Sequence, residues 1–262
     1  MYATSPLPYE ELEAILDRSL EPRGPDSLFE TVARTGLGEL SHVVDIGARD
    51  ARYSLVLAER FGCRVTAIDP VQDHVESARA AVRASDHSER IDVIRGVIED
   101  MPVDAGAADL VFCRDVLSHV ADLDAALREC RRVLAPGGRM IVYQTFATPW
   151  MEPLEAARLY PDLAVVPESM DPLRLERTAP ECGLEVESID PIGSEWRESW
   201  EEDGSRRTSR QLLHAARLLR AREDLVGALG EVDYRVELAN ALWGVYQMIG
   251  KLEPRIYVLR RD

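Results

Sequence analysis

Two carboxylates in this sequence follow apolar runs at positions where they can meet a ligand. The run 42–47 has the form of a buried parallel strand that contains Asp45, ends in Gly47 and leads into a helix. This arrangement predicts that backbone N–H groups face a ligand at the strand's carboxyl end, and Gly47 permits close approach because it lacks a Cβ. Asp69 ends the next apolar run, where a carboxylate can accept both hydroxyls of a ribose. For Asp45, a ligand contact and a structural role both remain open.

A second pair of polar residues, Asp115 and His119, follows a later apolar run at 109–113. Their spacing of four residues predicts that both side chains lie on one face of a helix. A neutral imidazole can accept a proton near neutral pH, so the pair is a candidate for general acid–base chemistry. The alternative is that His119 packs at the start of a helix and has no chemical role.

Short apolar runs alternate with amphipathic helices through the first part of the chain, which predicts the elements that position these residues. The predicted strands are 42–47, 64–69, 91–96, 109–113 and 139–144. Strands that alternate with helices at this spacing form βαβ units with right-handed crossovers. The sequence therefore predicts an α/β fold with a doubly wound parallel sheet.

Four regions are predicted from changes in this pattern. They are an N-terminal helical cap at 1–36, a core at 37–146, a substrate-cap segment at 147–170, and a region at 171–262 that completes the sheet. The last region has predicted strands at 184–190 and 256–259. A helical insertion at about 191–254 separates them, with helices near 208–222 and 231–249. An insertion of that size is most simply a lid over a substrate or an interface for a second subunit.

Several motifs of the core resemble one known family when they are taken together. They are the Asp-Ile-Gly loop in 43–51, Asp69, Gly-Val-Ile-Glu-Asp-Met-Pro at 96–102, the strand and following segment at 109–120, and Arg-Val-Leu-Ala-Pro-Gly-Gly at 132–138. Their order and spacing resemble the class I S-adenosylmethionine-dependent methyltransferases. A NAD-binding Rossmann protein is the alternative for the first loop, but it expects a strict G-x-G-x-x-G. Here Gly47 is present, but the two later glycines of that motif are missing. The usual loop of the methyltransferases is also glycine-rich, and this chain has Arg49 and Ala51 in it.

This resemblance implies a fold, a cofactor and a set of cofactor-binding residues. It implies a seven-stranded, mostly parallel sheet whose last strand is antiparallel, and S-adenosyl-L-methionine as cofactor with S-adenosyl-L-homocysteine as product. The implied cofactor-binding residues are Asp45, Gly47, Ala48, Asp69, Pro70, Ile98, Glu99, Cys113 and Arg114. The family often has an Asp where this chain has Val97, so the adenine amino group would need Glu99 or a backbone carbonyl.

The segment from Arg114 to His119 resembles the same segment of the phosphoethanolamine methyltransferases. In those enzymes the His pairs with a tyrosine of the N-terminal helix, and the Asp helps to orient the substrate amine. The resemblance therefore implies His119, Asp115 and Tyr9 as catalytic residues, with Tyr2 as the other candidate for the tyrosine.

Composition limits the partners and the location that we expect. The chain has 262 residues and a formal net charge of −16, which disfavours nucleic acid and anionic membranes because both attract Lys and Arg. The four cysteines form no CxxC pair, no apolar run approaches the length of a membrane span, and the first residues are unlike a signal peptide. We expect a cytoplasmic monomer or homodimer that acts on a small molecule.

The resulting hypothesis is methyl transfer from S-adenosylmethionine to an oxygen, nitrogen or acidic carbon atom of a small molecule, in specialised metabolism. The alternative is an enzyme of the same fold that binds S-adenosylmethionine and promotes a cyclisation or elimination without methylation. The substitutions Arg49 and Ala51 in the cofactor loop keep this alternative open.

We predict that the activity survives treatment with EDTA. The sequence has no cluster of His, Cys and carboxylates at ligand spacing, and Asp115 with His119 would supply too few ligands for a closed metal site. The test is turnover before and after chelation. Loss of activity that magnesium restores would contradict the prediction and indicate a metal-assisted mechanism.

Overall fold

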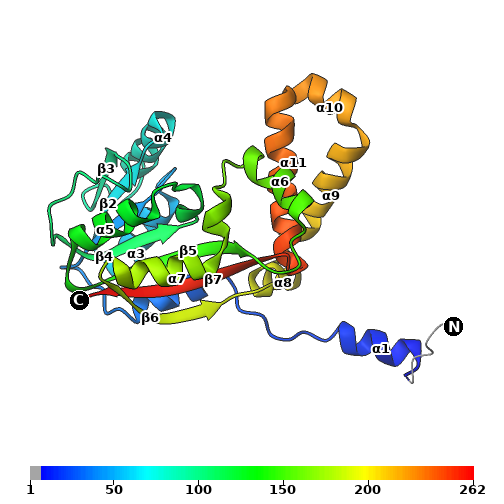
Figure 1. The fold of residues 1–262 in the computed structure, drawn as a ribbon, viewed down its shortest axis with the longest axis horizontal. Helices are drawn as coiled ribbons and strands as arrows, with labels where there is room; N and C mark the ends of the chain where they lie inside the picture. Colours follow the sequence, from blue (N-terminus) through cyan, green and yellow to red (C-terminus); the bar gives the residue numbers. More distant parts are fainter. Residues whose placement is uncertain (1–6) are drawn as a thin grey trace.

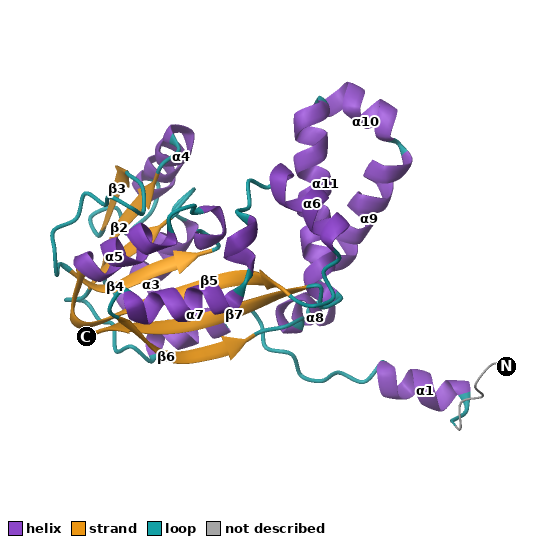
Figure 2. Ribbon diagram, viewed as in Figure 1, coloured by secondary structure: helices purple, strands orange, loops and turns teal. Residues whose placement is uncertain are grey.

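The computed structural model describes residues 7–262, which form a seven-stranded sheet with helices on both faces (Figure 1, Figure 2). The strand order is β3-β2-β1-β4-β5-β7-β6, and β7 runs antiparallel to both of its neighbours. The strands are β1 His42–Ile46, β2 Arg64–Asp69, β3 Ile91–Arg95, β4 Ala108–Arg114, β5 Leu134–Ala147, β6 Leu184–Pro191 and β7 Leu252–Arg261. The predicted fold class and the antiparallel last strand are confirmed.

Helices connect the strands and cover both faces of the sheet. The α-helices are α1 Tyr9–Leu16, α2 Ser27–Ala33, α3 Arg52–Phe61, α4 Gln72–Arg83, α5 Leu123–Val133, α6 Pro153–Asp162, α7 Pro172–Glu181, α8 Glu195–Glu202, α9 Arg207–Arg220, α10 Arg222–Leu229 and α11 Glu231–Met248. Two short 3₁₀ helices are η1 Leu117–His119 and η2 Pro167–Met170. Helices α5 and α7 pack on one face of the sheet, and α2, α3 and α4 pack on the other.

The central strands are apolar because they are buried on both faces. Val43 faces one helical layer and Val44 the other, and neither is exposed to solvent. Because neighbouring parallel strands end at the same edge, Asp45, Asp69 and Arg114 reach that edge together. The strand pattern of the sequence therefore determines where the polar groups gather.

The helical insertion lies beyond the carboxyl ends of β4 and β5 (Figure 1). Helix α11 packs against α9 and α6, and buried side chains of α6 and α11 share one apolar cluster with the start of β7. The predicted substrate-cap segment and the predicted lid thus form one helical body. Helix α10 adds to it a helix in the stretch between the two predicted helices, where the sequence analysis assigned none. In residues 7–262 no helix is long and apolar enough to cross a membrane.

The N-terminal region divides into two helices that behave differently. Helix α2 packs into the core through Leu28 and Val32, whereas in the described structure no residue of α1 is buried. Figure 1 shows α1 extending away from the rest of the molecule. Within the described part of the predicted cap at 1–36, α2 packs against the core and α1 stands apart from it.

Candidate functional site

Asp45 is a buried carboxyl group at the end of β1. Only 2% of the residue is exposed, and Oδ2 accepts a hydrogen bond of 2.5 Å from the Ser54 hydroxyl on α3. Burial raises the pKa of Asp45 from 3.8 to about 7, although the Ser54 hydrogen bond opposes the shift. The nearby Asp69 raises the pKa further and Arg114 lowers it. The ionisation of Asp45 therefore depends on the charges of Asp69 and Arg114 at the same strand edge.

Asp69 lies at the end of β2 with its carboxylate largely occupied by donors of the chain. Oδ2 accepts the Arg49 N–H at 2.9 Å, and Oδ1 accepts the Val71 N–H and the His74 ring N–H, each at 3.0 Å. A carboxylate has about four acceptor positions, so one remains. To accept both hydroxyls of a ribose, as predicted, Asp69 would need a second free acceptor position. The partly exposed His74 ring would have to move away to provide it.

The first two amide groups of the loop after β1 are hydrogen-bonded to the neighbouring strand β2. The N–H groups of Gly47 and Ala48 both donate to the carbonyl of Ile68, at 2.8 and 3.1 Å. The prediction that these amides face a ligand is therefore wrong for this arrangement. Gly47 is required for a different reason, because a Cβ at this residue would lie 2.5 Å from Cγ2 of Val116.

Arg49 and Ala51 replace two glycines of the family pattern and have φ angles of 51° and 60°. A non-glycine residue in this left-handed region costs about 1–2 kcal/mol. The backbone therefore keeps the glycine-type shape of the loop with other side chains. The Arg49 side chain is exposed, and its N–H supports Asp69.

Arg114 ends β4 between two aromatic rings. Its guanidinium carbon lies 4.8 Å from the ring centre of Tyr53 and 5.0 Å from that of Tyr143, and Nη1 lies 3.4 Å from Oδ2 of Asp115. Its Nε is buried and has no hydrogen-bond partner among the described residues. A buried donor without a partner is costly, so this N–H fits an acceptor group of a ligand.

Asp115 and His119 lie close in the chain but not on one helical face. Asp115 has a left-handed φ of 55° and precedes the short helix η1, so the predicted i, i+4 geometry is wrong. Burial raises the pKa of Asp115, while Arg114 and His119 lower it. Thr145 of β5 donates to Oδ1 of Asp115 at 3.5 Å.

The ring of His119 is exposed and oriented by one contact. Nδ1 lies 3.0 Å from the carbonyl oxygen of Ala164. Because a carbonyl only accepts hydrogen bonds, the neutral ring carries its proton on Nδ1 and leaves the lone pair of Nε2 available. The ring is thus oriented as a base would be.

Tyr9 lies on α1 and is 72% exposed, with its hydroxyl directed to Glu13 of the same helix. The structure does not bring Tyr9 to His119, and Tyr2 lies outside the described residues. Among the other predicted cofactor residues, Ile98 and Cys113 belong to the apolar core, whereas Pro70 and Glu99 are exposed.

A chain of buried polar side chains, which the sequence did not indicate, joins Asp115 to the helical insertion. Gln247 of α11 donates to the Thr145 hydroxyl at 2.9 Å and accepts from Nε of Arg197 at 2.7 Å. Gln247 lies within an apolar helix and Arg197 within an acidic run, so neither had a recognisable signal. Trp196 of α8 stacks on Tyr143 with ring centres 4.6 Å apart.

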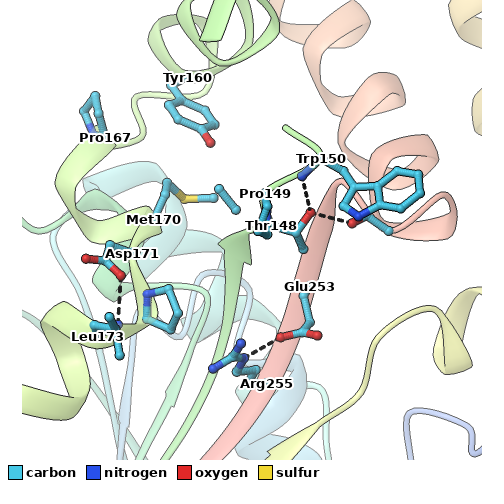
Figure 3. Close-up of a pocket in the computed structure, with 13 residues that line it drawn as sticks. Thr148, Pro149, Trp150, Tyr160, Pro167, Met170, Asp171, Leu173, Glu253 and Arg255 are labelled. Carbon is cyan, nitrogen blue, oxygen red and sulfur yellow. Dashed lines mark hydrogen bonds and ion pairs between the residues drawn. The ribbon is translucent and has the colours of Figure 1, made fainter. Parts of the chain in front are cut away.

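A cleft of about 750 Å³ opens at the end of β5 and the start of β7, beneath α6 and beside η2 and α7 (Figure 3). Pro149, Trp150 and Met170 supply its apolar wall, and the Glu253–Arg255 ion pair lies at its base. None of the predicted cofactor residues lines this cleft. It is therefore separate from the polar groups at the ends of β1, β2 and β4.

Comparison with known proteins identifies the core. Residues 44–142 match the family described as a methyltransferase domain. The centre of this chain is a methyltransferase domain. The match begins within β1 and ends within β5, before the helical insertion, so the domain contains the strand ends that carry Asp45, Asp69 and Arg114.

Curated relatives of this methyltransferase domain act on different acceptors. A sarcosine/dimethylglycine N-methyltransferase of Halorhodospira halochloris is 35% identical over 105 residues, which are 40% of this chain and 38% of that protein. A ubiquinone biosynthesis O-methyltransferase of Xanthomonas oryzae pv. oryzae is 34% identical over 110 residues, 42% of this chain and 45% of that protein. The chain thus matches less than half the length of these relatives.

A solved structure of similar fold extends the comparison to the insertion. The putative sarcosine dimethylglycine methyltransferase of Galdieria sulphuraria aligns over 90% of this chain and 84% of its own, with a TM-score of 0.69 and 17% identity. At this identity the likeness concerns the fold alone. The helical additions around the methyltransferase domain are thus part of a known architecture.

We predict that the free energy of unfolding of this protein falls as the pH rises, and that Asp45→Asn abolishes this decrease. Folded Asp45 has a raised pKa, so between about pH 4 and 7 the folded state holds a proton that the unfolded state loses, and stability falls through that window. Asn keeps the shape and an acceptor for Ser54 but does not titrate. Each pKa unit corresponds to about 1.4 kcal/mol.

Urea denaturation at pH 5 and pH 8 would measure this effect in the protein alone. The free energy of unfolding of Asp45→Asn minus that of the original protein is the quantity to compare. This difference should be more favourable to the variant at pH 8 than at pH 5, by roughly 2–4 kcal/mol. Asp50→Asn, at an exposed residue of the same loop, is the matched control and should show no such change. An equal relative stability of Asp45→Asn at the two pH values would contradict the assignment.

Proposed function

We propose that this protein transfers the methyl group of S-adenosyl-L-methionine to a small molecule and releases S-adenosyl-L-homocysteine. The observation that carries the proposal is the convergence of Asp45, Asp69 and Arg114 at one strand edge of a methyltransferase domain. Parallel α/β sheets bind ligands at this edge. The non-methylating alternative is not favoured, because the curated relatives above are methyltransferases.

The residues at the edge fit this cofactor in three respects. Asp69 keeps one acceptor position for a ribose hydroxyl, and Arg114 keeps an unpartnered buried N–H for a carboxylate. Asp45 can become ionised beside a positively charged group, since opposite charge lowers a carboxyl pKa. The remaining proposed contacts are with five residues: Gly47 and Ala48, through atoms other than their N–H groups, and Pro70, Ile98 and Glu99. Cys113 contributes by packing.

When bound, the cofactor supplies a methyl group on a positively charged sulfur. The protein then has to hold the acceptor in line with that methyl group and remove its proton where it has one. His119 presents the lone pair of Nε2 for that proton, because Ala164 fixes the proton of the neutral ring on Nδ1. Asp115, held by Thr145, orients the acceptor.

The acceptor atom is left open between oxygen, nitrogen and an acidic carbon, because the two curated relatives differ in it. The proposal also includes a place in specialised metabolism, a cytoplasmic location and a monomeric or homodimeric state. Mass spectrometry of reactions with trideuteromethyl-labelled S-adenosylmethionine and extracts of small molecules tests the main claim. A product without the label, formed without release of S-adenosylhomocysteine, would support the non-methylating alternative.

We predict that Asp69→Ala weakens binding of S-adenosylhomocysteine by about 1–3 kcal/mol, because a ribose hydroxyl loses its acceptor. His74→Ala should bind at least as tightly as the original protein, since it releases a second acceptor position of Asp69. Calorimetric titration measures both. Asp73→Ala, an exposed carboxylate at the start of α4, is the control, and an affinity unchanged in Asp69→Ala would refute the ribose contact.

We predict that His119→Ala lowers turnover by ~10²–10⁴ if the acceptor carries a proton, while the affinity for S-adenosylhomocysteine changes little. His214→Ala, an exposed histidine on α9, serves as the control. Full activity in His119→Ala, or an equal loss of stability and activity, would show that the ring has only a structural role.

Tyr9 can act with His119 only if α1 moves from the position described above. The test is the turnover rate and the stability of Tyr9→Phe compared with those of the original protein. A reduced rate with unchanged folding would indicate that α1 closes over the site during turnover, and an unchanged rate would remove Tyr9 from the catalytic set.

A further inference from the structure

Helix α8 carries a guanidinium group that contacts no carboxylate. Arg197 donates through Nε and Nη2 to Oε1 of Gln247, and through Nη1 to Oε1 of Gln211 at 2.7 Å. It takes part in none of the ion pairs within residues 7–262, whereas Arg222 and Arg235 of the same insertion each pair with a carboxylate. All its polar partners are therefore neutral.

The position of this guanidinium is closely defined by its surroundings. Gln247 is only 3% exposed, and a Cβ on Gly244 would lie 1.9 Å from Oε1 of Gln211. Helix α11 therefore needs glycine at 244 to admit the Gln211 amide that holds Arg197. The Trp200 ring adds a further contact, with its centre 4.9 Å from the guanidinium carbon. Two glutamine carbonyl groups and one ring thus fix the orientation of the cation.

A buried cation without a counter-ion is energetically unfavourable, because arginine stays charged when it is desolvated. Burial lowers the pKa of Arg197, and Asp115 and Tyr143 partly offset that effect. Arginine has five N–H donors, of which the glutamines use three. Two donors, one on each terminal nitrogen, therefore have no partner in the described structure.

The guanidinium lies beside the proposed acceptor site. Gln247 joins it to the Thr145 hydroxyl, which in turn contacts Asp115. The neighbouring Trp196 stacks on Tyr143, which precedes Thr145 by two residues on β5. Arg197 is thus a half-buried positive charge on the insertion, linked by two side chains to the carboxylate that orients the acceptor.

We propose that Arg197 binds a carboxylate group of the acceptor substrate, so that the substrates of this protein are small carboxylic acids. This inference rests on the proposed function and adds the substrate class to it. A guanidinium with two unused N–H groups can donate to the oxygens of a carboxylate, the anion that arginine binds most readily. Anchored at Arg197, the acid presents its acceptor atom toward Asp115 and His119.

Nuclear magnetic resonance of the Arg Nε–H groups tests the anion site without knowledge of the true substrate. The protein, labelled with ¹⁵N-arginine and saturated with S-adenosylhomocysteine, is titrated with acetate and separately with acetamide. Arg197→Lys and Arg207→Lys identify the two resonances of interest. Arg207 is the matched control, because its guanidinium carbon lies 5.0 Å from the same Trp200 ring but the residue is exposed.

We expect acetate to shift the Arg197 resonance in a saturable manner, and acetamide to leave it unchanged. The Arg207 resonance should respond weakly and without saturation. Equal responses of the two arginines, or no response of Arg197 throughout the acetate titration, would overturn the proposal. If calorimetry finds no binding of S-adenosylhomocysteine, the proposed function fails, and the titration of the unloaded protein still decides whether Arg197 binds a carboxylate.

Kinetics with an identified acid provide a second measurement. Arg197→Gln should raise KM for the acid by roughly 10–150-fold, as expected for loss of a hydrogen-bonded charged group, with a smaller effect on kcat. The same substitution should not change KM for the corresponding amide, and Arg207→Gln should leave both unchanged. An equal rise in KM for acid and amide would indicate a merely structural role and contradict the proposal.

Discussion

The desolvation of charged groups at the carboxyl ends of β1 and β4 is the constraint on which the rest of this structure depends. Asp45, Asp115 and Arg114 reach the same edge because parallel strands end together, and burial raises the pKa of both carboxyl groups. No one of these charges is stable there by itself. They are tolerated because they lie within one another's field and because aromatic rings and hydroxyl groups surround them.

The loop after β1 shows how that edge is kept in shape without the family's glycines. Gly47 remains, because Val116 of the segment after β4 packs directly against it. The backbone at Arg49 and Ala51 stays left-handed although neither residue favours it. The Arg49 N–H bonds Asp69 and the Ala51 N–H bonds the Ala48 carbonyl, which accounts for the retention of this conformation. The loop therefore acts as a support for the strand-end carboxylates.

The helical insertion is connected to the site through uncharged side chains. Gln247 contacts both Thr145 and Arg197, so the orientation of a strand-end carboxylate and that of a cation on α8 depend on one amide. Since an amide can donate and accept at once, it can join a hydroxyl to a guanidinium without adding charge. This arrangement keeps Arg197 free of an ion pair and available to a ligand.

The sequence by itself determined the sheet, the strand-end positions of Asp45, Asp69 and Arg114, and the methyltransferase family, because each depends on local periodicity and on motifs within 43–145. Only the tertiary structure decided where the loop amides point, that Ala164 orients His119, that α1 stands apart with Tyr9, and that Gln247 meets Arg197. These features join residues far apart in the chain or depend on one backbone angle. Neither leaves a repeating pattern in the sequence, because a single long-range hydrogen bond requires only one suitable side chain at each end.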